Sequence, residues 1–244
     1  KRKLSKIGAA YNPISLSRTS ISPISDIKTF FDITINLYRH KPDIVIAYTL
    51  KPIVYTGLAC LVLKIFRRKN KLYFYPMIEG LGYFFTIGKF SLKTFLLKQI
   101  IKLMYKISLI SSDTIIFLNP DDKEDFNKMS LITKGSNAER INGCGVDLNE
   151  FQPCALPNEN KFLILSRILI NKGIREFCRA AEIVKAKYPK TTFTIAGGFE
   201  NNPSGIEKDE IMNWVNKGVI EYLGNVDKVQ TLLKECKFYV FPSY

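Results

Sequence analysis

Short apolar runs alternate with amphipathic segments along nearly the whole chain, and this alternation limits the possible folds more than any other feature. The apolar runs have the length and the β-branched and aromatic content of buried strands, and they cover residues 43–47, 72–77, 114–118, 161–165, 192–196, 219–223 and 238–241. Helical patterns lie between them, at residues 26–39, 52–66, 91–110, 120–129, 172–187, 208–215 and 226–236. Because parallel strands need a crossover connection, this order predicts an α/β protein with Rossmann-like, doubly wound parallel sheets.

One stretch interrupts the alternation. Residues 143–160 combine glycines, prolines and polar residues, which is typical of a linker between two sheets. We therefore predict an N-terminal lobe over residues 1–148, a linker over 149–158 and a C-terminal lobe over 159–244. The second lobe has only four predicted strands, so we expect it to be incomplete.

The composition excludes several classes of protein. No apolar run approaches the roughly 18–20 residues that span a bilayer, and residues 1–20 lack the apolar core of a secretory signal. Five cysteines without CxxC spacing argue against a disulfide framework or a zinc site and fit a reducing cytosol. The single histidine, His40, follows a predicted helix and is interpreted as a surface residue, so neither serine–histidine catalysis nor histidine metal ligation has support.

The net charge of +14 predicts an anionic partner: nucleic acid, lipid headgroups or phosphorylated small molecules. Of the 36 basic residues, 23 lie in residues 1–157, beside only 12 acidic ones. Lys98, Lys102 and Lys106 follow one another at i, i+4 and i+8 on an otherwise apolar helix, and Arg67 and Arg68 belong to a nearby basic cluster. Together they predict a surface that meets anionic lipid; an ordinary core helix with a solvated lysine edge is the alternative.

The C-terminal lobe holds the strongest local signal. Arg167 leaves the end of a strand, and Lys172 and Gly173 stand at the start of the next helix, where free N–H groups favour an anion. At the ligand edge of an α/β sheet two such cations would clamp a diphosphate, unless they are solvated loop charges. Gly197 and Gly198 follow the next strand and either admit a ligand close to the backbone or form an ordinary turn.

Several segments together resemble a known family. SRILINKGIREFCRAAEIVKAKYP, FTIAGG and VIEYLGNVDKVQTLLKECKFYVFPSY resemble the nucleotide-sugar lobe of retaining glycosyltransferases of family 4, which have the two-lobe GT-B fold. PDIVIAYTLKPIVYTGLA, MIEGLGYFFT, IIFLNPDD and INGCGVDLNEFQP are similar to the bacterial branch that elongates lipid-linked sugars. The resemblance implies that Arg167 and Lys172 bind the donor diphosphate, and that Gly143, Gly145 and Asp147 lie in the loop at the lobe junction.

In the first lobe, Glu79 follows a strand at the edge that faces the ligand crevice, where a carboxylate can accept a proton from an acceptor hydroxyl or position it. The alternative is a turn with an exposed glutamate. Further candidates for contact with the acceptor lie beside Glu79 or at equivalent strand ends, namely Gly80, Gly82, Thr49, Lys51 and Asn119.

The implied activity is transfer, with retention, of a hexose or N-acetylhexosamine from a nucleoside diphosphate sugar, expected to be UDP-linked, to a polyprenyl-diphosphate-linked saccharide. It would take place on the cytoplasmic face of the membrane, by a peripheral protein, in lipopolysaccharide or other surface glycan assembly. No DxD-like motif ends a strand, so we expect no metal and no cofactor. The family's Glu-x7-Glu motif would follow Tyr244 and its first strand would precede Lys1, so we expect a fragment that is inactive alone.

Two other functions stay open at this point: a nucleic-acid-binding module that uses the basic lobe, and a noncatalytic membrane-docking lobe. Against nucleic acid, the basic residues are mixed with apolar helix faces, and no helix-turn-helix, zinc or RNA-binding signature occurs. We therefore expect no nucleic acid among the partners.

Overall fold

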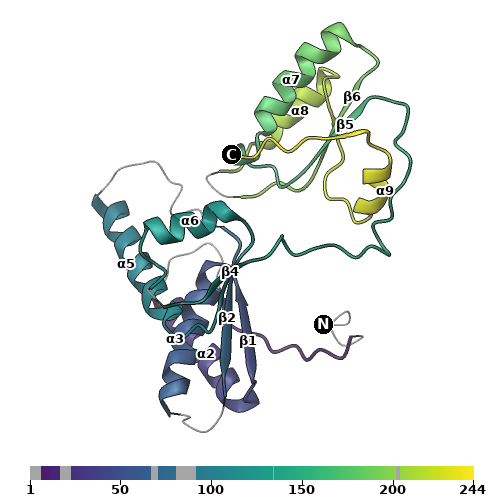
Figure 1. Ribbon diagram of the computed structural model, residues 1–244. Helices are drawn as coiled ribbons and strands as arrows, with labels where there is room; N and C mark the ends of the chain where they lie inside the picture. The colour runs from purple at the N-terminus through teal and green to yellow at the C-terminus, as the bar shows by residue number, and fades with distance from the viewer. Residues whose placement is uncertain (1–6, 17–22, 67–70, 81–91, 134, 202–203) are drawn as a thin grey trace. The chain divides into compact units, whose positions relative to one another are not determined.

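The computed structural model describes residues 7–16, 23–66, 71–80, 92–133, 135–201 and 204–244 (Figure 1). The chain divides into two compact units, Lys1–Gly145 (unit 1) and Val146–Tyr244 (unit 2). Each unit contains a four-stranded parallel sheet, which confirms the predicted α/β class. The two units are described separately below.

In unit 1 the strand order follows the chain, β1-β2-β3-β4. The strands are β1 (Ile44–Tyr48), β2 (Tyr73–Ile78), β3 (Ile115–Phe117) and β4 (Ala138–Arg140). Its described helices are α2 (Pro23–His40), α3 (Leu50–Phe66), α5 (Leu92–Leu109) and α6 (Pro120–Lys128). His40 is exposed at the end of α2, as expected for a surface histidine.

The core of unit 1 lies between the sheet and these helices. Along β1, Val45 and Ala47 are buried against the helices, whereas Ile44, Ile46 and Tyr48 alternate with them and are exposed. This period-two pattern fixes the register of β1, because a shift by one residue would turn Val45 and Ala47 away from the helices.

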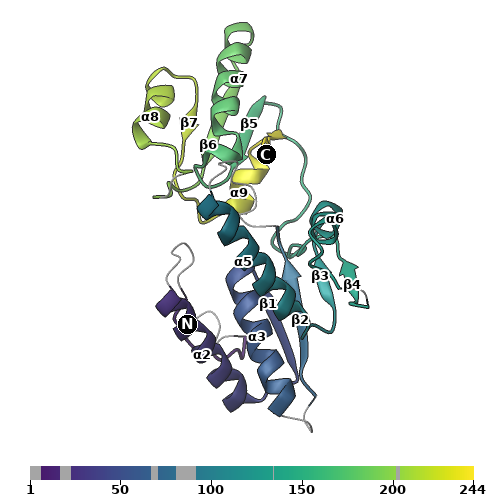
Figure 2. The ribbon, with the colours of Figure 1, turned by 90° about the vertical axis from the view of Figure 1, so that its left-hand side faces the viewer.

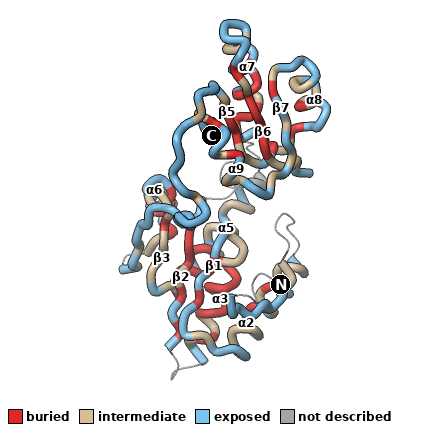
Figure 3. The backbone as a smooth tube through the Cα atoms, turned by 90° about the vertical axis from the view of Figure 1, so that its right-hand side faces the viewer, coloured by how far each residue is buried: buried red, intermediate tan, exposed pale blue. Residues whose placement is uncertain are grey.

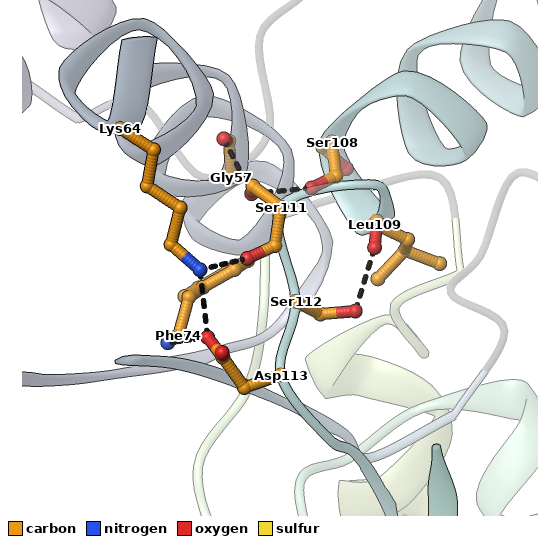
Figure 4. A network of polar contacts seen from close by, with 8 residues as sticks. All are labelled: Gly57, Lys64, Phe74, Ser108, Leu109, Ser111, Ser112 and Asp113. Atoms are coloured by element: carbon orange, nitrogen blue, oxygen red, sulfur yellow. Dashed lines mark hydrogen bonds and ion pairs between the residues drawn. The ribbon is translucent and has the colours of Figure 1, made fainter. Parts of the chain in front are cut away.

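Polar contacts join helix α3 to α5 and to the sheet, next to the point where Gly57 of α3 approaches Ser108 of α5 closely (Figure 4). A Cβ atom at Gly57 would lie 2.6 Å from the carbonyl oxygen of Ser108, so only glycine allows the two helices to approach this far. The hydroxyl of Ser111 donates to the Gly57 carbonyl at 2.8 Å. Lys64 donates to the Asp113 carboxylate at 2.8 Å, and the same carboxylate oxygen accepts the N–H of Phe74 at 2.8 Å. The contacts of Lys64 and Asp113 lie where α3 ends and β2 and β3 begin, so they hold the sheet at the amino ends of these two strands.

In unit 2 the strand order is β7-β6-β5-β8. The strands are β5 (Lys161–Leu165), β6 (Thr192–Ala196), β7 (Glu221–Tyr222) and β8 (Phe238–Tyr239), and the helices are α7 (Ile174–Lys187), α8 (Lys208–Asn216) and α9 (Val229–Lys234). Figure 3 shows most of β6 buried, and in β5 Leu163 and Ile164 are buried. Ile164 and Ile195 pack with α7 and α8, whereas Leu163 and Ala196 pack with Leu232 of α9, so helices cover both faces of this sheet.

Unit 2 departs from the sequence prediction at the helix expected over residues 172–187. Residues Ile170–Lys172 form a 3₁₀ turn, η1, and α7 begins only at Ile174. Gly173 separates them with a φ of +68°, a left-handed conformation that interrupts the helix and that favours glycine. The physical reason is local packing, because a Cβ atom at Gly173 would overlap the backbone of Pro242.

Candidate active site

The carboxyl ends of the parallel strands of unit 2 meet at one edge of its sheet, which we call the donor edge. The segments that begin at Ser166, Gly197 and Val240 leave β5, β6 and β8 at this edge. Open α/β sheets bind their ligands at such an edge, because the loops there are free to surround a small molecule. The donor edge therefore contains the cationic residues that were singled out from the sequence.

Arg167 lies on the donor edge immediately after β5. Its side chain is 62% exposed and forms an ion pair with Glu200 at 3.6 Å. The backbone around it is fixed by a hydrogen bond from the Ile168 N–H to the Gly198 carbonyl at 2.9 Å. An exposed pair at this distance is weak, so the guanidinium can exchange Glu200 for a more highly charged anion at small cost.

Lys172 ends η1, and its ammonium lies 5.5 Å above the ring centre of Phe241. This cation–π contact holds the ammonium beside the segment that leaves β8. Two hydrogen bonds of Tyr244 also fix that segment. Its N–H donates to the Asn171 carbonyl at 3.1 Å, and its side chain donates to the Glu176 carboxylate, which lowers the pKa of Glu176. Lys172 is thus half-buried and placed by its surroundings.

The amino end of α7 adds the partial positive charge of its backbone N–H groups to the charges of Arg167 and Lys172. The first N–H groups of an α-helix lack partners within the helix and carry a partial positive charge. Since Gly173 precedes α7 directly, these groups lie beside Lys172. The donor edge therefore offers a phosphate group an arginine, a lysine and a helix amino end.

Gly197 and Gly198 both have a packing reason to be glycine. A Cβ atom at Gly197, where φ is +143°, would overlap the carbonyl of Ser166, and one at Gly198 would lie 2.6 Å from Oδ1 of Asn225. The carbonyl of Gly197 accepts the Tyr222 hydroxyl at 2.8 Å. The close approach of neighbouring segments is enough to explain why both residues are glycine. Contact of Gly197 and Gly198 with a nucleotide stays a prediction.

Unit 1 has a corresponding edge, formed where β1, β2 and β3 end, which we call the acceptor edge. Thr49 is exposed there with a φ of +64°, an uncommon conformation for a threonine. Lys51, in the first turn of α3, pairs with Asp26 of α2 at 2.7 Å, with side chains 15% and 17% exposed. Glu79 is exposed directly after β2 and precedes Gly80, whose φ is +133°. Gly82 lies outside the described residues.

Asn119 follows β3 at the acceptor edge and caps helix α6. Its side-chain oxygen accepts the N–H of Asp122 at 2.8 Å, and its amide donates to the Asp122 carboxylate at 2.6 Å. Asp121 and Asp122 lie in the first turn of α6 and complement its positive amino end. The side chain of Asn119 thus has a structural role, and contact with an acceptor stays a prediction.

The loop predicted at the lobe junction is exposed. Gly143 and Gly145 have φ values of +74° and +70° with open space around them, so they serve the turn of the backbone. The carboxylate of Asp147 accepts the N–H of Asn149 at 2.8 Å, which closes a local turn. This geometry agrees with a connecting loop and gives none of the three residues a chemical role of its own.

The predicted lipid surface is described in part, since Arg67 and Arg68 lie outside the described residues. Lys98 and Lys102 are half-buried. The exposed side of α5 carries Phe95, Leu96 and Leu103, each more than half exposed. Helix α5 therefore presents hydrocarbon to solvent between its lysines. Within the described ranges, no helix combines the length and apolar character needed to cross a membrane.

Other kinds of catalytic group lack support among the described residues. They contain no cluster of three or more His, Cys, Asp or Glu side chains that could hold a metal ion. Burial raises the pKa of the Cys60 and Cys178 thiols to about 12, so neither supplies a thiolate nucleophile near neutral pH.

Comparison with known proteins shows what unit 2 is similar to. The family model described as glycosyl transferases group 1 matches residues 159–244. These residues are similar to that family. They include the whole donor edge, from Arg167 to the segment that follows β8.

Comparisons that cover nearly the whole chain agree. The chain is 28% identical over 257 residues to the N,N'-diacetylbacillosaminyl-diphospho-undecaprenol alpha-1,3-N-acetylgalactosaminyltransferase of Campylobacter jejuni, covering 100% of this chain and 64% of the relative. Sucrose-phosphate synthase from Thermosynechococcus elongatus superposes with a TM-score of 0.68 and 18% identity, over 94% of this chain and 58% of that one. The Anabaena HepE protein in complex with UDP superposes with a TM-score of 0.64 and 12% identity, over 91% of this chain and 59% of that one.

These findings confirm the resemblance to glycosyltransferases and the GT-B class of the two sheets. The chain spans less than two thirds of each of these proteins. Membership of family 4 and retention of stereochemistry stay predictions.

Three contacts of the two edges were not foreseen from the sequence: the pairing of Asp26 with Lys51, that of Glu200 with Arg167, and the ring of Phe241 under Lys172. Only Phe241 had a usable signal, because an aromatic residue that closes a buried strand in an α/β sheet lies at the ligand edge.

Proposed function

We propose that this chain is part of a glycosyltransferase that moves a hexose or an N-acetylhexosamine from a nucleoside diphosphate sugar to a lipid-linked saccharide. One observation carries the proposal: Arg167, Lys172 and the amino end of α7 all lie on the donor edge of a unit that is similar to the glycosyl transferases group 1 family. A diphosphate is the ligand that two cations and a helix amino end bind best. The UDP complex among the structural neighbours supports UDP as the nucleotide.

The same groups provide the catalytic effect. As the bond between the sugar and the diphosphate breaks, negative charge grows on the leaving oxygen, and fixed cations bind that charge more strongly in the transition state than in the substrate. Arg167 is suited to two parallel hydrogen bonds with phosphate oxygens, and Lys172 supplies a compact charge. In this proposal these side chains neutralise the leaving group and no metal ion is needed.

The acceptor is proposed to bind at the acceptor edge of unit 1. The Campylobacter jejuni relative is named for an acceptor sugar carried on diphospho-undecaprenol, which supports a polyprenyl-diphosphate-linked saccharide here. Glu79 is exposed where β2 ends, so its carboxylate can accept a hydrogen bond from the attacking hydroxyl and orient it. Thr49 lies exposed at the neighbouring strand end, and in this proposal it contacts the acceptor sugar.

Peripheral association with the cytoplasmic face of the membrane is part of this proposal, because a lipid-linked acceptor does not leave the bilayer. The exposed Phe95, Leu96 and Leu103 of α5 supply apolar contact. Lys106, exposed on the same helix, supplies attraction to anionic headgroups.

The experiment that tests the function is a transfer assay with the full-length protein. UDP-N-acetylhexosamines and UDP-hexoses are supplied in turn with a polyprenyl-diphosphate-linked saccharide, and the organic phase is analysed by mass spectrometry. The proposal predicts a lipid product that is heavier by one sugar residue. Consumption of the nucleotide sugar with no change in the lipid would contradict it.

A further inference from the structure

Helices α2, α3 and α5 lie side by side on one face of the unit 1 sheet, with α3 in the middle (Figure 2). A groove of about 620 Å³ follows α3 between the two outer helices. Its lining is almost wholly hydrocarbon and includes Ile27, Phe30, Val54, Leu58, Leu61 and Ile100. Ile27 and Ile100 are 58% and 55% exposed, so the groove is accessible from solvent.

The sequence of α3 explains why such a groove exists. The helix LKPIVYTGLACLVLKIF is apolar almost all round, which is typical of a helix buried on every side. Its inner side packs on the sheet through residues such as Ala59 and Cys60. Its outer side, with Leu58 and Leu61, is only half-buried and forms the floor of the groove. This outer face is as apolar as a protein core, yet the described residues cover it only in part.

One end of the groove is polar, and it lies at the acceptor edge. Asp26 and Lys51 line the groove there as an ion pair of 2.7 Å. Tyr55 adds a hydrogen bond to Asp26, and burial, together with the Asp26 charge, raises the pKa of Tyr55 to about 12. Helix α3 begins two residues after β1 ends, so this polar end is next to Thr49. From Leu50 to Val62 the floor extends about 18 Å away from that edge, at 1.5 Å per residue.

We propose that this groove binds the hydrocarbon chain of the lipid-linked acceptor, with its diphosphate and saccharide left at the acceptor edge. The proposal rests on the proposed function and specifies how that substrate is held. A prenyl diphosphate is apolar along its length and charged at one end, and the groove is apolar along its length and polar at the end nearest the reacting groups. Along the whole floor of the groove, the hydrocarbon chain would be transferred out of water, and this burial of apolar surface is the main source of its affinity.

A second copy of the chain and the bulk membrane fit this geometry less well. Either would cover the groove along its whole length and remove the remaining exposed part of the Asp26–Lys51 pair from water, which costs free energy unless the pair gains polar partners. A single chain that stops before the pair avoids this cost.

The test measures binding of geranyl and farnesyl diphosphate to the full-length protein by calorimetry, without detergent. We expect affinity to rise about tenfold or more with the longer prenyl chain, because more apolar surface is buried. Leu58→Trp fills the floor and should lower farnesyl diphosphate affinity at least tenfold. Ile65→Trp is the matched control on the same helix, 64% exposed and outside the groove lining, and should bind as the unchanged protein does. Circular dichroism melting checks that both variants fold.

Four results would overturn the proposal. The first is equal affinity for the two prenyl diphosphates. The second is unchanged affinity in folded Leu58→Trp. The third is binding to anionic phospholipid vesicles but not to either free prenyl diphosphate, which would make the groove a membrane contact. The fourth is a dimer that Leu58→Trp converts to a monomer in sedimentation, which would make the groove a contact between copies.

Failure of the groove and failure of the proposed function are distinguishable. If the groove assignment is wrong and the function is right, Leu58→Trp transfers sugar to the long-chain acceptor at the unchanged rate. If the function is wrong, no sugar is transferred by any variant, while prenyl diphosphate binding and its loss in Leu58→Trp remain measurable.

Discussion

Replacement of Arg167 or Lys172 by alanine is expected to lower the rate of sugar transfer by the full-length protein about 30- to 1,000-fold. Each change removes a cation that contacts the leaving diphosphate, and such a contact contributes roughly 2–4 kcal/mol in the transition state. Both side chains lie on the donor edge and neither belongs to the core, so the melting temperature should barely change. The measurement is kcat/KM for the nucleotide sugar, with melting followed by circular dichroism.

Two further variants sharpen this prediction. Arg167→Lys should recover only part of the rate, because a point charge does not reproduce two parallel hydrogen bonds to phosphate oxygens. Lys190→Ala is the matched control, since Lys190 is an exposed cation that precedes β6 at the opposite edge of the same sheet. Unchanged transfer rates in both alanine variants at the donor edge would show that the two cations do not act on the diphosphate.

Replacement of Gly173 by alanine should destabilise unit 2 far more than the same change at Gly218. The two glycines have nearly the same φ, +68° and +67°, so alanine suffers similar backbone strain of about 1–2 kcal/mol at each. Only at Gly173 does the new Cβ overlap the backbone of Pro242. We expect Gly173→Ala to cost about 1–3 kcal/mol more than Gly218→Ala, through displacement of the segment after β8.

Trp214 reports this difference directly. It is the only tryptophan of the chain, lies in α8 and packs against the core of unit 2. Urea unfolding followed by its fluorescence therefore gives the free energy of unfolding of this unit. Equal losses in the two variants would mean that the contact between Gly173 and Pro242 contributes nothing to stability.

The sheets could be predicted from the sequence because their signals are local. β5 and β6 were predicted with the bounds that the structure has, since a buried parallel strand is a continuous apolar run. Arg167 and Lys172 were found for the same reason: both follow β5 within a few residues, and the end of a parallel strand defines the ligand edge.

The remaining features depend on contacts between distant residues. Asp26 and Lys51 are 25 residues apart, and no periodicity links an aspartate in one helix to a lysine in the next. The lysines of α5 were predicted as an exposed stripe, yet Lys98 and Lys102 are half-buried while Leu103 is exposed. The side of a mostly apolar helix that faces the core is decided by packing against α3, which the residue pattern of α5 alone does not contain.

The central claim is that the donor edge recognises a diphosphate, and the most direct measurement compares UDP with uridine in calorimetric titrations of the full-length protein. The account predicts that UDP binds at least about tenfold more tightly than uridine, because only UDP reaches Arg167, Lys172 and the amino end of α7. It also predicts that this difference disappears in the Arg167→Ala/Lys172→Ala double variant. Equal affinity for UDP and uridine in the unchanged protein would contradict the account.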